Sequence, residues 1–261
     1  MKETSSKSLL KALTEAGAGS RRRVADAIMH GLVRVNGSVV SDLRYAVDVK
    51  KDRVEVDGRL VDIKPQKHVY LMLNKPAGVL STVRDERGRR TVIDILPEKY
   101  RSMGLHPVGR LDKDSTGLLL LTNDGEFTYR LTHPKFEKDK EYLLQIDGVL
   151  KPHEVNALWK GVELEDGATH GAAVKLIRSA PPFNYSITLH EGRKRQVRRM
   201  FASLGHRVVA LRRVREGDIV LGALGEGHVR ELSDGEAAGY QVKADVTRVR
   251  PRDVFSASTY K

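Results

Sequence analysis

One stretch of the chain constrains its fold more than any other. A polar segment, residues 109–117, runs directly into four consecutive leucines, Leu118–Leu121. A short apolar run bounded by a glycine-containing loop is typical of a buried β-strand. Asp112 would then lie at the mouth of a hydrophobic core, where its neighbours tune the reactivity of a carboxylate. The stretch therefore predicts both a central strand and a candidate reactive group.

Length and charge indicate the size of the protein and the kind of partner it has. The 261 residues are enough for one large or two modest domains, and the formal net charge is +12. The positive charge gathers in residues 21–23 and 193–199. Such clustering favours a nucleic acid as the partner over a merely soluble basic surface.

The residue types that are missing narrow the possible chemistry. The chain has no cysteine, which excludes disulfides, thiol catalysis and thiolate metal sites. No apolar run approaches the ~20 residues of a membrane span. The first residues also lack the apolar core of a signal peptide. We therefore expect a cytoplasmic protein with no membrane association.

The N-terminal residues predict two short helices. Residues 6–17 show helical apolar spacing, and Ser20 is a suitable N-cap for a second helix. Arg21, Arg22 and Arg23 fall in the first turn of that helix, where cations oppose the helix dipole. A phosphate bound over them would reverse the penalty.

The residues after these helices complete a recognisable small unit. Asn36-Gly37 is the strongest short hairpin signal, and residues 54–58 alternate in polarity as a strand. Two helices, a basic first turn and a hairpin resemble the S4 RNA-binding module, most specifically at residues 16–22. The resemblance implies that Arg21 to Arg23 bind RNA. The alternative is a generic α+β unit with a solvated basic face.

The domain boundaries follow from composition and periodicity. We expect an S4-like domain over residues 1–62, a polar linker over 63–68, a second domain over 69–240 and a mobile basic tail over 241–261. In the second domain, strands are predicted near residues 69–73, 118–121, 141–146, 172–177, 185–189, 208–214 and 218–221. On a helix predicted over 152–161, Trp159 falls on the apolar face and is expected in the core.

Two interpretations of Asp112 need no family resemblance. In the first, Arg110 and Asp112 form an ordinary ion pair that fixes a loop. In the second, residues 112–116 match the Asp-x-Asp-x-Thr signature of haloacid dehalogenase-like phosphatases. In that fold the apolar strand precedes the first aspartate, whereas here it follows. The strand order therefore disfavours the phosphatase interpretation.

The third interpretation is based on four motifs in order. Gly-Arg-Leu-Asp at residues 109–112 and the segment through Gly125 resemble the catalytic motif of pseudouridine synthases of the RsuA/RluB/RluE/RluF family. The resemblance continues through residues 74–78, 140–142 and 191–200. With the S4-like domain in front, it covers residues 6 to about 232. It implies an α+β fold with a mixed, largely antiparallel β-sheet flanked by helices.

The family resemblance implies a specific reaction. These enzymes isomerise uridine in RNA: the N1–C1′ bond breaks, the base turns over, and C5 bonds to C1′. Because no redox change occurs and no group is lost, neither cofactor nor metal is required. The reaction needs a carboxylate that acts as nucleophile or base at the sugar, and Asp112 holds that position in the motif. The sequence leaves open whether Asp112 attacks C1′ or removes a C2′ proton.

The resemblance also implies partners for this carboxylate. Arg198 is placed against Asp112, where a cation offsets the tendency of burial to neutralise a carboxylate. Tyr142 corresponds to the family tyrosine, which stacks on the target base and helps to remove the C5 proton. Without the motif, Tyr142 would be read as an ordinary strand residue packed in the core.

Further residues are expected to hold the RNA. Arg110 is expected to order the catalytic loop and hold the flipped nucleotide. Lys75, Arg195 and Arg199 are candidates for phosphate contacts, which position RNA without reading its sequence. The expected partner of this monomer is ribosomal RNA or a pre-ribosomal particle, and residues 87–97 resemble the large-subunit (23S) branch. The alternatives are small-subunit (16S) ribosomal RNA as substrate, or a non-catalytic assembly factor.

Overall fold

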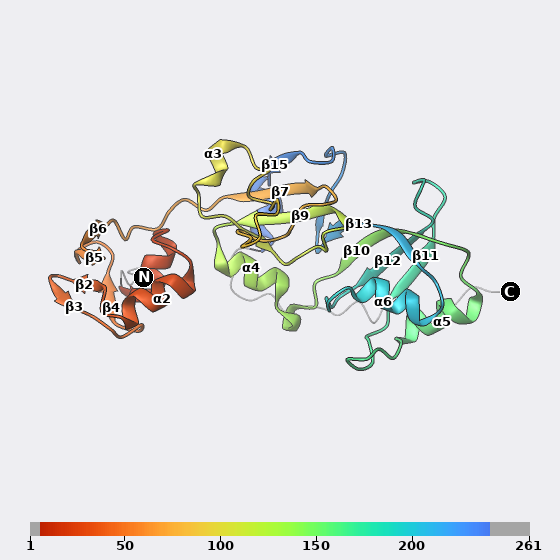
Figure 1. Ribbon diagram of the computed structural model, residues 1–261, viewed down its shortest axis with the longest axis horizontal. Helices are drawn as coiled ribbons and strands as arrows, with labels where there is room; N and C mark the ends of the chain where they lie inside the picture. Colours follow the sequence, from red (N-terminus) through yellow and green to blue (C-terminus); the bar gives the residue numbers. More distant parts are fainter. Residues whose placement is uncertain (1–5, 241–261) are drawn as a thin grey trace.

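The computed structural model describes residues 6–240, which form two units arranged along the long axis of the molecule (Figure 1). The N-terminal unit comprises residues 6–63 and the C-terminal unit residues 69–240. No helix within residues 6–240 is long and apolar enough to cross a membrane. The tail expected at residues 241–261 lies outside the described part of the chain.

The N-terminal unit packs two helices against short strands. Its elements are β1 (Ser6–Ser8), α1 (Leu9–Glu15), α2 (Arg21–Met29), β2 (Val33–Val35), β3 (Ser38–Val39), β4 (Ala46–Asp48), β5 (Val54–Val56) and β6 (Arg59–Val61). The larger sheet has the order β3-β2-β5-β6. Ser20 caps α2 by accepting a hydrogen bond from the Arg23 amide at 3.3 Å, and the hairpin turns at Asn36 and Gly37, both with positive φ. These findings confirm the predicted cap and hairpin.

The C-terminal unit is built on one nine-stranded sheet of order β11-β12-β10-β13-β9-β7-β15, with β14 beside β13 and β8 beside β9. Its strands are β7 (Tyr70–Lys75), β8 (His106–Val108), β9 (Thr116–Thr122), β10 (Lys140–Ile146), β11 (Ala173–Leu176), β12 (Tyr185–Leu189), β13 (Val208–Glu216), β14 (Ile219–Val220) and β15 (Val229–Glu231). Its helices are α3 (Glu98–Arg101), α4 (Gly125–Thr132), the 3-10 helix η1 (Pro134–Phe136), α5 (Pro152–Lys160), α6 (Gln196–Ser203) and α7 (Asp234–Ala238).

Strand direction in this sheet matches the expected mixed, largely antiparallel arrangement. The strand pairs in the sheet run antiparallel except β9 and β13, which are parallel neighbours. This parallel contact joins two halves of the unit. One half contains β7, β8, β9 and β15, and the other contains β10, β11 and β12 with α5 and α6 (Figure 1).

The leucine run occupies the centre of the first half. Leu119 and Leu121 pack into one hydrophobic cluster, whereas Leu118 and Leu120 pack into another on the opposite face of the sheet. All four side chains are fully buried. A strand covered on both faces needs apolar residues at every position rather than at alternate ones. This burial explains the continuous run and confirms the predicted central strand.

The second half has its own core, covered by α6. Val197, Met200 and Phe201 of this helix pack into the cluster formed with β10, β12 and β13. The prediction for Trp159 is wrong, because its side chain is 67% exposed on α5. Leu158, its neighbour, is the buried residue. A helix packed on one side buries a narrow stripe, and Trp159 lies outside that stripe.

The segment expected as a linker is bound to both units. Ile63 belongs to the core of the N-terminal unit, and the Gln66 amide and side chain donate to carbonyl oxygens at the end of α1, each at 3.0 Å. The Asn123 side chain of the C-terminal unit donates to Lys67 O at 3.1 Å and accepts from Val69 N at 2.9 Å. Adjacent residues, Gln66 and Lys67, are therefore attached to different units.

Candidate active site

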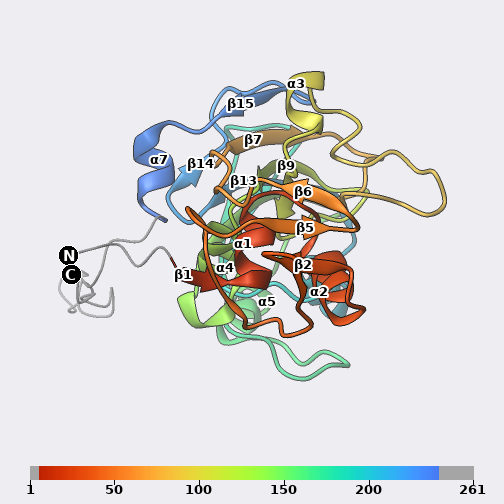
Figure 2. The same cartoon turned by 90° about the vertical axis from the view of Figure 1, so that its left-hand side faces the viewer.

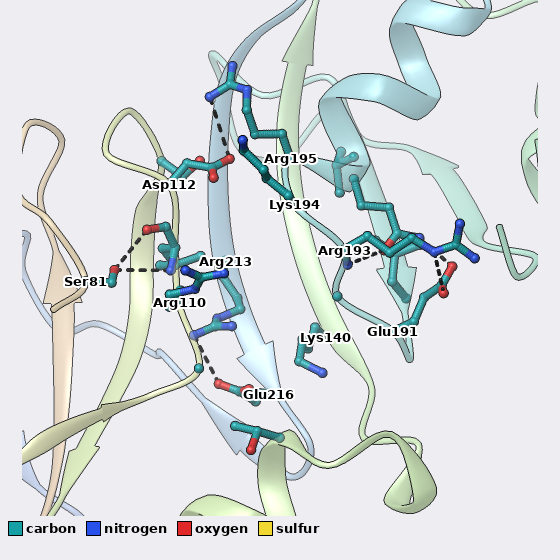
Figure 3. A pocket seen from close by; sticks show the side chains of 18 of the residues that line it. Ser81, Arg110, Asp112, Lys140, Glu191, Arg193, Lys194, Arg195, Arg213 and Glu216 are labelled. Carbon is teal, nitrogen blue, oxygen red and sulfur yellow. Dashed lines mark hydrogen bonds and ion pairs between the residues drawn. The ribbon is translucent and has the colours of Figure 1, made fainter. Parts of the chain in front are cut away.

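A cavity of about 920 Å³ opens between the two halves of the C-terminal unit. This volume lies within the range that holds small ligands. The wall from the first half includes Asp112 and Arg110, and the wall from the second includes Tyr142 and the segment before α6 (Figure 3). Figure 3 shows Asp112 facing Arg195 and, elsewhere in the cavity, Arg213 facing Glu216.

The loop that carries Asp112 is fixed by short-range and long-range hydrogen bonds. Ser81 Oγ donates to Leu111 O at 2.9 Å and accepts from Leu111 N at 3.1 Å, so this side chain clamps the residue before Asp112. The Ser115 amide donates to Asp112 O at 3.1 Å, which closes a turn before β9 begins. The loop therefore presents Asp112 with little backbone freedom.

Lys75 forms hydrogen bonds with the backbone of the same loop. This residue was expected to contact a phosphate, but its side chain is completely buried. Its ammonium group donates to Ser115 O at 2.8 Å, Pro76 O at 2.9 Å and Lys113 O at 3.4 Å. Burial lowers the pKa of Lys75 to about 8, although the charges of Asp114 and Asp112 act in the opposite direction. Lys75 therefore positions the loop and does not reach a bound phosphate.

Two arginines at the start of α6 face the loop that carries Asp112, in an arrangement that differs from the expected one. Arg198 was expected against Asp112, but its Nη2 lies 3.1 Å from Asp114 Oδ2, and its Nη1 donates to Val208 O at 2.7 Å. Arg195 is the arginine near Asp112, with its Nη1 at 3.8 Å from Asp112 Oδ2 and 3.3 Å from Asp114 Oδ1. Asp114 thus competes with Asp112 for the same cations.

Asp114 itself behaves as an ion-pair partner. Partial burial acts to raise the pKa of Asp114, but Arg198 and Arg195 outweigh that effect and the pKa is lowered. Because Asp112 and Asp114 are two residues apart, one arginine cluster attaches the whole loop to α6. Arg198, only 11% exposed, is the more rigidly held of the two arginines.

Tyr142 lies between the two halves and contacts the hydrophobic clusters of both. Its hydroxyl interacts with the buried Arg213, which also donates from Nε to Leu118 O at 2.8 Å. Burial raises the pKa of Tyr142, and Arg213 only partly offsets this effect. The phenol is therefore neutral near pH 7. On the same guanidinium, Nη2 lies 3.1 Å from the fully buried Glu216.

The remaining arginines of the predicted RNA-binding set have different environments. Arg199 forms a two-pronged ion pair with Asp166, at 2.8 and 3.0 Å, so protein already engages its guanidinium. Arg110 is exposed and lines the cavity. Arg21, Arg22 and Arg23 are exposed on the first turn of α2 in the other unit. The structure therefore places Arg110 and Arg195 near Asp112, and directs Arg199 elsewhere.

Several residues of the site were missed by the sequence analysis. Arg213 and Glu216 form a buried ion pair, Ser81 clamps the loop, and Asp114 captures Arg198. Arg213 could have been noticed, because it shares a strand face with the buried Leu211 two residues earlier. Ser81 and Asp114 depend on contacts between segments far apart in the sequence, whereas Glu216 is only three residues from Arg213. In residues 6–240 no group of three or more His, Asp or Glu side chains is placed to hold a metal ion.

Comparison with known proteins agrees with this combination of fold and cavity. The model of the RNA pseudouridylate synthase family matches residues 69–203, and that of the S4 domain matches residues 8–54. A crystal structure of a pseudouridylate synthase superimposes with a TM-score of 0.64 at 32% identity, covering 89% of this chain and 98% of that one. A pseudouridylate synthase domain preceded by an S4 domain places the protein in the class of RNA-modifying enzymes. The chain belongs to the RNA pseudouridylate synthase family and carries an S4 domain.

Relatives from several bacteria are similar over most of their length. The ribosomal large subunit pseudouridine synthase B of Bacillus subtilis is 41% identical over 91% of this chain and 96% of its own. An uncharacterized RNA pseudouridine synthase of Aquifex aeolicus is 40% identical over 87% and 91%. The synthase B of Vibrio vulnificus is 41% identical over 82% of this chain and 67% of its own.

Proposed function

We propose that this enzyme converts a uridine of large-subunit ribosomal RNA to pseudouridine, with Asp112 as the group that acts on the sugar. The observation that carries the proposal is the position of Asp112, on a clamped loop at a cavity shared with Tyr142 and Arg195. The names of the relatives from Bacillus subtilis and Vibrio vulnificus support the choice of ribosomal RNA and of the large subunit.

The reaction begins with cleavage of the bond between N1 and C1′. In one route an oxygen of Asp112 bonds to C1′ while the electron pair of the broken bond leaves with the uracil ring. In the other, Asp112 takes the C2′ proton, the electron pair of the C2′–H bond forms a C1′–C2′ double bond, and the electron pair of the N1–C1′ bond leaves with the ring. Both routes need the ionised carboxylate. Arg195 and Lys75 are the cations near Asp112 that favour this charge, together with Arg198 across Asp114.

The second half of the reaction turns the ring and bonds C5 to C1′. In the first route the bond between Asp112 and C1′ breaks and its electron pair returns to the carboxylate; in the second, Asp112 gives the proton back to C2′. Tyr142 reaches the cavity from between the two cores and offers a rigid aromatic face for stacking. The C5 proton must then leave, and its electron pair restores the C5–C6 double bond. We assign Tyr142 to base stacking, with Arg213 holding its hydroxyl in place. Because the phenol is neutral, it can take the C5 proton only by giving up its own proton in the same step.

RNA binding supplies the energy for moving the uridine out of its stack. Extruding a nucleotide costs a few kcal/mol, which contacts to neighbouring phosphates offset. Arg110 and Arg195 lie at the cavity for such contacts, and Arg21 to Arg23 form a second basic surface on the N-terminal unit. A substrate bound at both surfaces is an extended RNA rather than a free nucleoside.

The test replaces one carboxylate and keeps its neighbour. We expect Asp112→Asn to abolish pseudouridine formation in ribosomal RNA, measured by carbodiimide labelling and primer extension, while RNA affinity stays nearly unchanged. Asp114→Asn is the matched control, because Asp114 shares Arg195 with Asp112. This control variant should show slower but measurable turnover. Residual turnover in Asp112→Asn would remove Asp112 from its assigned role.

The choice of substrate needs a separate measurement. Pseudouridines are mapped in both ribosomal RNAs of cells with and without the gene. We expect one large-subunit site to disappear with the gene and to return when the gene is restored. Loss of a small-subunit site instead would refute the large-subunit assignment and leave the reaction itself intact. An unchanged map would contradict both.

A further inference from the structure

The outer surface of α4 and η1 carries a group of aromatic side chains that the reaction at Asp112 does not use. On the inner face of α4, Phe127 and Leu131 are buried in the core. Tyr129 and His133, four residues apart, project from the other face, and Tyr129 is 40% exposed. Phe136 of η1 completes the group, which we call the aromatic platform: Tyr129, His133 and Phe136.

The three rings of the platform contact one another. The ring centroid of Tyr129 lies 4.7 Å from that of His133 and 5.6 Å from that of Phe136. The ammonium group of Lys135 lies 4.7 Å from the Tyr129 centroid and 4.7 Å from the Phe136 centroid. Such cation–π contacts at exposed sites are weak, so Lys135 is available to exchange a ring face for a stronger anionic partner.

The backbone fixes the platform before any ligand arrives. The imidazole Nδ1 of His133 accepts a hydrogen bond from the Lys135 amide at 3.2 Å, which caps η1. Glu137 ends η1 in a left-handed conformation, with φ of 44°. A role confined to folding would favour burial of these rings, yet His133 and Lys135 are exposed, Tyr129 is 40% exposed and Phe136 is half-buried. The arrangement instead suits a partner that stacks on rings.

The position of the platform identifies that partner. His133, Pro134 and Glu137 line the same cavity as Asp112 and Tyr142. Along the long axis of the molecule, α4 lies between the N-terminal unit, with its exposed arginines, and the half that contains α6 (Figure 1). Figure 2 looks along this axis with the N-terminal unit toward the viewer. Because His133 lies at the cavity and α4 lies between the two basic surfaces, an RNA strand that joins these surfaces can cross the platform.

We propose that Tyr129, His133 and Phe136 stack on a base of single-stranded RNA next to the target uridine, while Lys135 contacts the adjoining phosphate. This inference rests on the proposed function, because it assumes a uridine in the cavity. Moving that uridine out of its stack leaves a neighbouring base without a partner, and an aromatic surface at the rim of the cavity replaces the lost stacking. Stacking is tolerant of base type, so the platform adds affinity without choosing a sequence.

The first test measures RNA binding without turnover. The probe is a fluorescein-labelled, uridine-rich single-stranded RNA of about 12 nucleotides, a length near the upper end for single-strand sites. We expect Tyr129→Leu with Phe136→Leu to weaken binding about 5- to 100-fold at every salt concentration, since rings release no counterions. Lys135→Gln should instead reduce the salt slope by about 0.7. Trp159→Leu is the matched control, since it removes a more exposed aromatic on α5.

A second variant reports on stacking directly and keeps the ring. Trp159 is the only tryptophan in the chain, so Trp159→Phe with Tyr129→Trp places a single tryptophan on the platform. We expect its emission to be quenched by the RNA probe, and not by the same probe with abasic nucleotides. Equal quenching by both probes, or wild-type binding by the leucine variant, would overturn the platform. Failure of the uridine reaction would leave these binding results unaffected, so the two proposals fail separately.

Discussion

Lys75 lies against the loop that carries Asp112, with its ammonium group directed at three carbonyl oxygens and near the carboxylates of Asp112, Asp114 and Glu226. Its lowered pKa, about 8, makes this cation sensitive to mildly alkaline conditions. The folded state releases the Lys75 proton near pH 8, whereas the unfolded chain keeps it until about pH 10.5. Between these values the unfolded chain binds more protons, so the contribution of Lys75 to the free energy of unfolding rises with pH.

This titration gives a prediction in which stability and activity move in opposite directions. As pH rises through about 8, the loop loses a cation near Asp112, and we expect the rate of pseudouridine formation to fall while stability at this group increases. Initial rates and urea unfolding, measured from pH 6.5 to 9.5, test both signs. Lys75→Arg keeps a charge that does not titrate, so the alkaline decrease in rate should disappear in that variant. An identical decrease in the variant would assign the effect to another group.

Residues also show where prediction from sequence succeeds and where it ends. The buried strand, and the position of Asp112 just before it, were predictable because both follow from a local pattern along the chain. The partners of Arg198 and Arg199 were not, because Asp114 and Asp166 are 84 and 33 residues away in sequence, and only the fold brings them close. Lys75 was misassigned for the same reason, since its carbonyl partners belong mainly to another segment.

Among the elements, β9 and β13 determine how the two halves of the C-terminal unit meet. Their parallel pairing places Arg213 opposite Gly117, at the start of β9. Gly117 has φ of +102°, and a Cβ added there would collide with the backbone of Arg213. The close approach of these two strands thus depends on a residue without a side chain. It also positions the Arg213 side chain that contacts Tyr142.

Gly117→Ala should therefore separate the two strands. We expect a loss of about 2–4 kcal/mol in the free energy of unfolding, from backbone strain combined with the steric collision. Gly88→Ala is the matched control: Gly88 also has positive φ, but a Cβ there meets nothing within 4 Å. In that control variant the free energy of unfolding should fall by only about 1 kcal/mol. Urea unfolding compares the two, and equal losses would show that the collision is relieved without cost.

The sequence patterns of individual helices and strands differ in how much of the fold they predict. The leucine run predicted a buried strand, and burial on both faces explains why it lacks alternation. The helix with Trp159 was predicted correctly as a helix, but the position of its buried stripe was wrong. Amphipathic spacing fixes which residues share a face, whereas the width of the covered stripe depends on the neighbouring elements.

At the scale of the whole molecule, we expect the basic surface of the N-terminal unit to bind RNA together with the cavity. Replacing Arg21, Arg22 and Arg23 with Ala should weaken RNA binding and reduce the salt slope by about 2, if all three contact phosphates. The fold should tolerate the change, because these side chains are exposed and oppose the dipole of α2. Binding is measured by fluorescence anisotropy over a range of salt concentrations, and stability by thermal unfolding.

A triple variant with the same change in charge provides the control. Lys160, Lys175 and Arg178 are exposed cations in the half of the C-terminal unit that contains α5. Their replacement with Ala should leave the salt slope close to that of the unmodified enzyme. If both triple variants reduce the slope equally, the effect belongs to net charge, and the N-terminal unit has no specific place in the RNA interface.

The bonds at Gln66 and Lys67 have a consequence for how this enzyme selects its substrate. Gln66 is bound to the N-terminal unit and Lys67 to the C-terminal unit. These bonds restrict how far the first turn of α2 can move from the cavity at Asp112, so the distance between the two is a defined span. If the arginines of α2 bind RNA while a uridine enters the cavity, we expect selection by spacing: the preferred uridine is the one whose distance from the bound part of the strand equals that span. A uridine in identical local sequence at another spacing should then react more slowly.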